Sequence, residues 1–144
     1  MKQKEHKRLY FFVDESGDPY FYNRDGEYVV GKEGCSRILI VGLIKTEEPE
    51  HLRKAMGFLK EEIFKDEYLK AVPSFPRSMQ SFHATDDIPE IRERVYKAIK
   101  GLNFKSEFVV ARKKEDVFIS RHKKRPNIFY DDIVSKLFEN KLHK

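Results

Sequence analysis

The stretch of sequence that decides the fold is Leu9-Tyr10-Phe11-Phe12-Val13-Asp14-Glu15-Ser16-Gly17-Asp18. Its apolar half predicts a strand over residues 9–14 that is buried on both faces and ends in turn-forming residues. Carboxylates at the end of a buried strand are costly to desolvate unless a cation meets them. Mg²⁺ or Mn²⁺ would meet that need, because both prefer oxygen ligands. The same residues also fit an ordinary polar turn in which Gly17 takes a positive φ.

Length and composition predict a cytoplasmic globular protein with no membrane partner. The 144 residues are expected to form a basic N-terminal extension, residues 1–8, and a single domain, residues 9–144. A hydrophobic content of 40% with 12 Phe and 7 Tyr excludes global disorder. No apolar stretch approaches the roughly 20 residues that span a bilayer, and the N-terminus lacks the apolar centre of a secretory signal. The single cysteine, Cys35, fits a reducing compartment and is expected to be structural rather than nucleophilic.

The hydrophobic periodicity predicts an α/β protein with a mixed sheet flanked by helices. Residues 38–44 are the most strand-like run, and we expect them to lie beside the first strand at the centre of the sheet. Residues 20–30 predict two strands around an Asp25-Gly26 turn, and residues 104–112 predict a later strand. Helices are expected from Pro49, over residues 89–100 and over residues 127–142. Residues 68–81 contain two prolines and no clear period, which predicts a loop.

Particular side chains are expected to hold these elements together. Asp86 or Asp87 is expected to cap the helix at 89–100, and Asn127 the last helix. Asp131 and Asp132 would then place favourable charge in the first turn of that helix. The side chains expected to be largely buried are Phe12, Val13, Leu39, Val41, Leu43, Leu59, Val95 and Leu137.

Positive charge is concentrated between residues 112 and 125. Seven basic and two acidic residues give this segment a net charge of +5, equal to the formal charge of the whole chain. Such a patch is the electrostatic footprint of a phosphate-backbone binder, which makes nucleic acid a possible partner. A solvated loop is the alternative, although Phe118 and Ile119 predict that it is pinned to the core. The candidate nucleic-acid-binding residues are Arg112, Lys113, Lys114, Arg121, Lys123, Lys124 and Arg125.

Carboxylates and one histidine are the candidates for chemistry. On a regular strand Asp14 and Glu15 face opposite sides, so they cannot both reach one ion, whereas Asp18 can curl back beside Asp14. His83 follows a loop and precedes two acids, which fits an acid–base role, a substrate-positioning role or a plain capping residue. The catalytic candidates are Asp14, Glu15 and His83, and the metal candidates are Asp14 and Asp18.

The opening stretch resembles the signature of the family named domain of unknown function 3800 (DUF3800), a hydrophobic strand followed by Asp-Glu-Ser-Gly-Asp. Residues Phe82-His83-Ala84-Thr85-Asp86 resemble that family's second block, where a His-Ala pair precedes a helix. The resemblance implies a ribonuclease H-like fold. It also implies that the first-strand aspartate, here Asp14, helps to bind a divalent metal for phosphodiester hydrolysis.

The family continues beyond the helix expected at 127–142, with a strand that bears an aspartate and a terminal helix with a Gln-x-Ala-Asp-like motif. The resemblance therefore implies that the late carboxylates of a two-metal cluster are missing here and that the family domain is incomplete at its C-terminus. A fragment, a naturally short chain and completion by a partner are the open alternatives, and by itself the chain is expected to bind metal weakly and to cut poorly or not at all. Two function classes stay open: a divalent-metal-dependent nuclease-like domain, and a non-catalytic nucleic-acid- or protein-binding module on the same scaffold. The sequence leaves the oligomeric state open.

Overall fold

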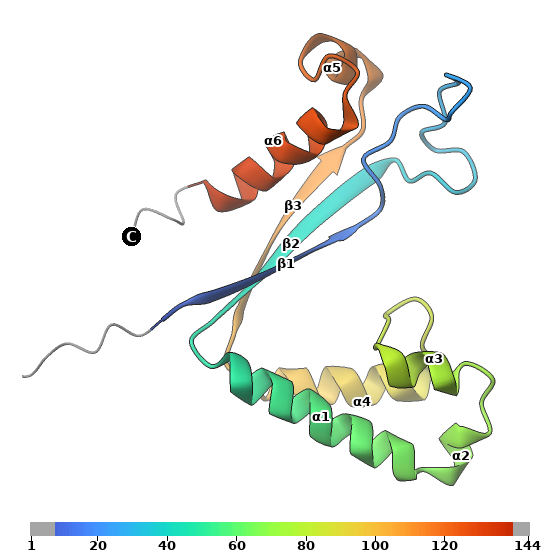
Figure 1. Cartoon of the computed structure of the whole chain (residues 1–144), viewed down its shortest axis with the longest axis vertical. Coiled ribbons are helices and arrows are strands. Elements are labelled where there is room, and N and C mark those ends of the chain that lie inside the picture. Colours follow the sequence, from blue (N-terminus) through green and yellow to red (C-terminus); the bar gives the residue numbers. More distant parts are fainter. Residues whose placement is uncertain (1–7, 140–144) are drawn as a thin grey trace, which may run out of the picture. The chain divides into compact units, whose positions relative to one another are not determined.

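The computed structural model describes residues 8–139, which fold into the elements labelled in Figure 1. The strands are β1 (Tyr10–Ser16), β2 (Ile38–Thr46) and β3 (Lys105–Arg112). The helices are α1 (Pro49–Lys65), α2 (Glu67–Lys70), α3 (Phe75–Gln80), α4 (Pro89–Lys100), α5 (Glu115–Ser120) and α6 (Pro126–Phe138). Of the expected N-terminal extension, residues 1–7 lie outside the described residues, as do residues 140–142 of the last predicted helix.

The chain divides into two compact units, which we describe separately. The sheet unit comprises Phe11–Lys45 and Lys105–Lys144, and the helical unit comprises Met1–Tyr10 and Thr46–Phe104. The expected single domain over residues 9–144 stays a prediction, because two compact units can belong to one domain.

The three strands form an antiparallel sheet in the order β1-β2-β3. The predicted central position of residues 38–44 beside the first strand is confirmed, and so is the α/β class. The described strands are antiparallel, whereas the sequence predicted a mixed sheet. In the β2–β3 ladder Gly42 lies opposite Phe108, and a Cβ atom at Gly42 would come within 2.7 Å of two carbons of the Phe108 ring. The ring therefore occupies the space that a side chain at position 42 would need.

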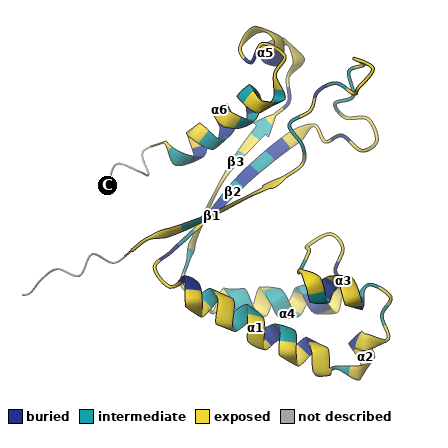
Figure 2. Ribbon diagram, viewed as in Figure 1, coloured by how far each residue is buried: buried dark blue, intermediate teal, exposed yellow. Residues whose placement is uncertain are grey.

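One face of β2 forms the core of the sheet unit. Burial alternates along this strand, and Leu39, Val41 and Leu43 are the buried residues, as predicted (Figure 2). Helix α6 packs against β3. The rest of this core comes from the loop after β1 and from α5 and α6: Phe21, Phe118, Phe129, Ile133 and Leu137.

The predicted burial of β1 is wrong. Phe12 is 41% exposed and Val13 is 42% exposed. Strand β1 lies at the edge of the described sheet, so its side chains have a neighbouring strand on one side only. Phe11 is half-buried and packs edge-on against Phe138 of α6, with ring centroids 6.0 Å apart. A continuous apolar run predicted a strand correctly but did not distinguish a central strand from an edge strand.

The segment at 20–30 forms the predicted turn without the predicted strands. Tyr22 and Tyr28 form one isolated antiparallel bridge. Between them the Asn23 side chain accepts hydrogen bonds from the backbone N–H groups of Asp25 and Glu27, at 3.0 and 2.9 Å. Gly26 supplies a φ of +82°. The turn is therefore fixed by the Asn23 amide rather than by a strand ladder.

The helical unit is built on α1 and α4, which pack against each other. Both helices begin at a proline, whose fixed φ suits the first turn, and α4 ends at Gly101, as predicted. The predicted burial of Leu59 is confirmed, whereas Val95 is only half-buried. The core residues of this unit are Leu59, Ile63, Leu69, Phe75 and Ile91.

The loop predicted at residues 68–81 is instead two short helices, α2 and α3. Asp66 caps α2, because its carboxylate accepts hydrogen bonds from the backbone N–H groups of Tyr68 and Leu69 at 3.1 and 3.3 Å. Proline stands in the first turn of α3, where its missing N–H costs nothing. The prolines that suggested a loop therefore accompany a helix start.

The predicted helix caps at α4 and α6 are also wrong. The residues at the cap positions are Ile88 and Arg125, and neither makes a side-chain cap hydrogen bond. The first turn of α6 holds no acidic residue, so Asp131 and Asp132 lie one turn further along the helix. Both helices use a first-turn proline, which removes one of the donors that a cap would satisfy.

Candidate functional site

The acidic end of β1 faces helix α6 through Glu15. The hydroxyl of Tyr130 on α6 donates a hydrogen bond to Glu15 Oε2 at 3.2 Å. Phe11 contacts the same helix, so Phe11 and Glu15 share one face of β1. Asp14, between them in sequence, therefore lies on the opposite face, as the alternation predicted.

The pKa of Tyr130 reflects its burial and the negative charge around it. Its pKa is raised above the ordinary value, first by partial burial and then by the carboxylates of Glu15, Asp14 and Asp131. The phenolate would add a negative charge beside three others, so the neutral hydroxyl is favoured. The charges of three carboxylates from β1 and α6 therefore act on one hydroxyl group, and Glu15 is its hydrogen-bond partner. The sequence analysis named two of them and missed Tyr130 and Asp131 as their neighbours.

These carboxylates have no cationic partner in the part of the chain that the structure describes. Within residues 8–139, Asp14, Glu15 and Asp131 form no ion pair with Lys, Arg or His. Over the same residues, no three His, Cys, Asp or Glu side chains are arranged so that they could hold a metal ion by themselves. The cluster is thus a concentration of negative charge that offers oxygen ligands without completing a protein cage.

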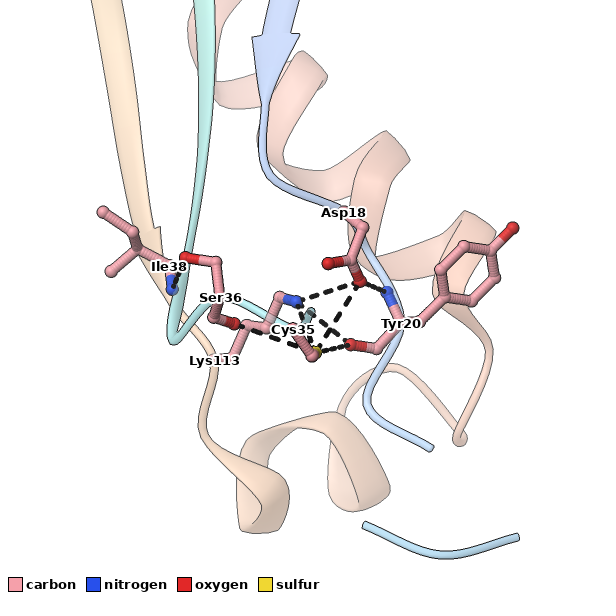
Figure 3. Close-up of polar contacts among 6 residues, drawn as sticks. All are labelled: Asp18, Tyr20, Cys35, Ser36, Ile38 and Lys113. Atoms are coloured by element: carbon pink, nitrogen blue, oxygen red, sulfur yellow. Dashed lines mark hydrogen bonds and ion pairs between the residues drawn. The ribbon is translucent and has the colours of Figure 1, made fainter. Parts of the chain in front are cut away.

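Asp18, the second metal candidate, binds a lysine instead (Figure 3). Lys113 Nζ lies 3.1 Å from Asp18 Oδ1 and donates to the Tyr20 carbonyl at 3.0 Å. The Lys113 side chain has no exposed surface, while that of Asp18 is 30% exposed. A metal ion at Asp18 would compete with a buried ammonium group. The tight bend at Gly17, where a Cβ would meet the Ile38 carbonyl oxygen at 2.8 Å, carries the chain from β1 to this pair.

Cys35 completes the cluster around Lys113. Lys113 Nζ lies 3.5 Å from Cys35 Sγ, and the thiol is directed at the Tyr20 carbonyl at 3.6 Å (Figure 3). The cysteine is buried, in agreement with the structural role predicted for it. These polar contacts of Lys113 therefore hold the segment after β1 against the end of β3.

The basic segment divides into buried and exposed residues. Lys113 is buried with Asp18, so its ammonium does not reach the surface where a nucleic acid would bind. Phe118 is buried, which confirms the predicted anchoring, and its ring stacks on Phe21 with centroids 3.8 Å apart; Ile119 is 43% exposed. The remaining candidates are all exposed: Arg112, Lys114, Arg121, Lys123, Lys124 and Arg125.

The turn after α5 presents two adjacent lysines in an unusual conformation. Lys123 and Lys124 have φ angles of +53° and +56°, in the left-handed region that favours glycine. Lys124 Nζ lies 5.8 Å from the centre of the Tyr22 ring. Tertiary contacts hold this turn, because Lys124 N donates to the Phe118 carbonyl at 3.1 Å.

His122, which the sequence analysis did not single out, anchors the same turn from inside. The ring is buried, its Nε2 lies 3.3 Å from Asp132 Oδ2, and its Nδ1 has no hydrogen-bond partner. Asp132 also pairs with Arg121 at 3.0 Å. Burial alone would raise the pKa of Asp132, but His122, Lys136 and Arg121 outweigh it and hold that pKa below its usual value.

His83 lies in the helical unit, away in the chain from the carboxylates of β1. Its side chain is exposed, and its backbone N–H donates to Asp87 Oδ2 at 2.6 Å. Asp87 is buried and also accepts from Ser78 Oγ at 2.5 Å, which explains why it does not cap α4. A hollow of 220 Å³ beside His83 is lined by Phe82, His83, Ala84, Asp87, Arg92, Val95 and Tyr96. His83 belongs to the helical unit and Asp14 to the sheet unit.

Comparison with known proteins adds no relative. No protein-family model, curated protein or solved structure matches the chain. No helix within residues 8–139 is long and apolar enough to cross a membrane.

Proposed function

We propose that the sheet unit is a nuclease-like module that hydrolyses phosphodiesters with the help of Mg²⁺ or Mn²⁺. The observation that carries the proposal is the acidic end of β1, where Glu15 accepts a hydrogen bond from Tyr130 and where, among residues 8–139, neither Asp14 nor Glu15 forms an ion pair. The resemblance of residues 10–18 to DUF3800 supports the same role for Asp14, together with a ribonuclease H-like fold. A cytoplasmic location belongs to the same proposal and rests on the single, buried cysteine.

The donor set fits a hard divalent cation. Mg²⁺ keeps several of its waters and is usually held by one or two carboxylates together with substrate phosphates. Few protein ligands are therefore compatible with a metal site in which waters and the phosphates of the substrate supply the remaining ligands. Asp14 would hold the ion together with substrate phosphate, and the bound cation would neutralise phosphate charge and make water a better nucleophile.

The other residues of the cluster have roles of their own. The Tyr130 hydroxyl donates to Glu15 and so limits the orientations of that carboxylate. The raised pKa of Tyr130 extends to more alkaline pH the range in which its hydroxyl stays protonated and donates this hydrogen bond. Exposed cations of the basic segment would hold the phosphate backbone of a nucleic acid in the same unit.

A second candidate function is non-catalytic nucleic-acid binding, favoured by the turn at Lys123 and Lys124. Two lysines in a left-handed conformation, next to exposed Arg125, present positive charge on a turn that the core holds in place. Replacing all three by Ala should lower affinity for all nucleic-acid sequences about equally. It should also flatten the salt dependence, whose slope on duplex DNA is about −0.9 per phosphate neutralised. Unchanged binding by the triple variant would show that these residues do not bind nucleic acid and that the segment is only a solvated loop.

Metal binding tests the first candidate. Mn²⁺ titration of the full chain should reveal a site that Asp14→Asn removes, because that change keeps the side-chain shape but deletes its charge. Asp25→Asn is the matched control, since Asp25 is an exposed turn carboxylate of the same unit. In a parallel Mg²⁺ titration the pKa of Tyr130 should fall toward its ordinary value, because the cation offsets the carboxylates that raise it.

Cleavage of labelled DNA and RNA in Mg²⁺ or Mn²⁺ should be weak in the present chain. It should be lost with Asp14→Asn, because that change removes the charge that would hold the metal ion. Equal Mn²⁺ affinity in the native chain and in Asp14→Asn would exclude Asp14 as the ligand. Robust cleavage by the Asp14→Asn chain would refute the catalytic assignment.

A further inference from the structure

A hollow of 540 Å³ lies at the end of the sheet, where β2 begins and β3 ends. Its volume falls within the range of about 300–1,000 Å³ that is common for small-molecule sites. It belongs entirely to the sheet unit and shares no residue with the cluster around Tyr130. The lining residues are Tyr28, Val30, Arg37, Ile38, Arg112 and Lys113.

The backbone brings two arginines to this hollow. Ile38 pairs with Arg112 in the β2–β3 ladder, and the N–H of Lys113 donates to the Arg37 carbonyl at 3.0 Å. Arg37 is therefore opposite Lys113 and one position out of register with Arg112. The two arginines leave the ladder on alternate sides, and both reach the hollow because it lies at the end of the sheet. Gly31 has a φ of +82°, and a Cβ there would approach Arg37 Nε to 2.6 Å. The absence of a side chain at Gly31 is what lets Arg37 lie against this loop.

Neither guanidinium is paired with a carboxylate of the described part of the chain. Among residues 8–139, Arg37 and Arg112 form no ion pair, whereas Arg94 and Arg121 each pair with an aspartate. Lys113 does not supply its charge to the hollow, because its ammonium is buried against Asp18. An anion in the hollow would be attracted to both guanidinium groups. The planar guanidinium matches the oxygens of a phosphate in a two-pronged hydrogen bond.

The other walls suit a flat, partly apolar group. Tyr28 and Val30 are half-buried, and Ile38 is 37% exposed. The Tyr28 ring is held edge-on to the Tyr22 ring, with centroids 5.8 Å apart, so its position is fixed before any ligand arrives. Nucleobases bind single-strand-binding proteins largely by stacking on such aromatic side chains.

We propose that this hollow binds one nucleotide of a nucleic-acid strand, with the phosphate between Arg37 and Arg112 and the base against Tyr28, Val30 and Ile38. The inference rests on the proposed function for the class of polymer. It deepens that function by naming where a strand is held, and it requires neither Asp14 nor a metal ion.

The test is a titration of the ¹⁵N-labelled full chain with deoxyadenosine 5′-monophosphate in EDTA, followed by NMR. Saturable shifts are expected at the backbone amides of Val30, Gly31 and Ile38. Arg37→Gln and Arg112→Gln should each weaken binding by roughly tenfold to a hundredfold, the effect of losing one charged hydrogen-bonding partner. The affinity of Arg37→Lys should lie between that of the native chain and that of Arg37→Gln, because lysine keeps the positive charge but cannot make the two-pronged hydrogen bond of the guanidinium. Arg24→Gln, which removes the same charge from an exposed site outside the lining, should bind like the native chain.

Two further probes separate the parts of the ligand. Adenosine, which lacks the phosphate, and inorganic phosphate, which lacks the base, should each bind at least about tenfold more weakly than the nucleotide. Inorganic phosphate that binds as tightly as the nucleotide would overturn the nucleotide assignment, and so would an equal loss of affinity in Arg24→Gln. An absence of localised shifts in the native chain would overturn the site itself.

The variants and the metal titration separate a failure of the nucleotide site from a failure of the nuclease proposal. Dispersed spectra of both glutamine variants are required to show that the fold survives; if either unfolds, Arg37→Lys alone decides the role of the guanidinium. Nucleotide binding in EDTA without any Mn²⁺ site at Asp14 would end only the nuclease proposal. An intact Mn²⁺ site without nucleotide binding would end only the present one.

Discussion

The sheet unit and the helical unit have different interiors. The sheet unit packs aromatic rings, with Phe21 stacked on Phe118 and edge-on to Phe129, and it encloses the ammonium of Lys113 (Figure 3). The helical unit packs mainly aliphatic side chains, and its buried acid, Asp87, is held by neutral donors. The charged groups of a sequence therefore serve the interior of one unit and mainly the surface of the other. Composition alone does not separate these two uses.

The units also differ in how the chain builds them. Apart from its N-terminal part, the helical unit is one continuous stretch, Thr46–Phe104, whereas the sheet unit joins Phe11–Lys45 to Lys105–Lys144. Local patterns suffice to assemble a continuous stretch of helices. The contacts that define the candidate sites of the sheet unit, such as Tyr130 with Glu15 and Lys113 with Asp18, span about a hundred residues of sequence.

The largest expected effect sharpens the contrast between the two cores. Phe118→Ala should lower the free energy of unfolding by about 3–5 kcal/mol, because it empties the centre of the aromatic stack. Leu59→Ala in the helical unit should cost about 2 kcal/mol, as a smaller side chain that is 6% exposed. Urea unfolding measures both, and Val117→Ala, at a neighbouring position that is 38% exposed, is the control. A larger loss for Leu59→Ala than for Phe118→Ala would break the comparison.

The next effect compares an ion pair from each unit. Lys113→Ala should cost about 3 kcal/mol, because it leaves Asp18 and the Tyr20 carbonyl without their buried donor. Arg94→Ala, which breaks the Asp66 pair of the helical unit, should cost about 1 kcal/mol or less, since that pair meets solvent.

Lys114→Ala is the matched control for Lys113→Ala, because it removes the same charge from the adjacent, exposed position. Thermal unfolding of the three variants measures the differences. Equal losses for Lys113→Ala and Lys114→Ala would mean that the buried contacts of Lys113 add nothing to stability.

The smallest effect concerns acid. The pKa of Asp132 is held below 3.8 against the effect of burial by His122, Lys136 and Arg121, and the pKa of Asp66 is held below 3.8 chiefly by Arg94. A carboxyl whose pKa is lowered in the folded state stabilises the protein above its unfolded pKa, and this contribution is lost as the pH falls through the folded value. Stability should therefore decline below about pH 4, and Asp132→Asn or Asp66→Asn should each make the decline shallower. Urea unfolding across that range tests it, and a slope unchanged in both variants would contradict it.

Much of the fold follows from local patterns in the sequence. The apolar run at 38–44 predicted β2, and the helical spacing after Pro49 and Pro89 predicted α1 and α4. The same reasoning failed for β1, because hydrophobicity does not reveal which strand lies at an edge, and for α3, because its first-turn proline begins a helix rather than a loop. It also failed for α2, whose four residues are too few to show a helical period. The caps failed for a related reason, since Asp87 satisfies Ser78 and His83 instead of the helix.

The candidate sites depend more on contacts that no local pattern encodes. Asp14 and Glu15 were recognisable from the end of an apolar run, but their neighbours Tyr130 and Asp131 come from a helix more than a hundred residues later. Lys113 was counted with its basic neighbours because a net charge gives each lysine the same weight. Its burial depends on Asp18 and Cys35, which precede β2. Arg37 drew no attention at all, because only the β2–β3 register brings it near Arg112.

The contact between Gly42 and Phe108 has a consequence for how this sheet can vary. Any side chain at position 42 would need the volume that the Phe108 ring fills, within 2.7 Å of where its Cβ would lie. An aromatic ring over a glycine on a neighbouring strand shields backbone that would otherwise be bare. The residues tolerated at position 42 therefore depend on the residue at position 108, and the reverse is also true. In a library randomised at both, aromatic residues at 108 should be recovered together with glycine at 42, and larger residues at 42 should be recovered together with small ones at 108.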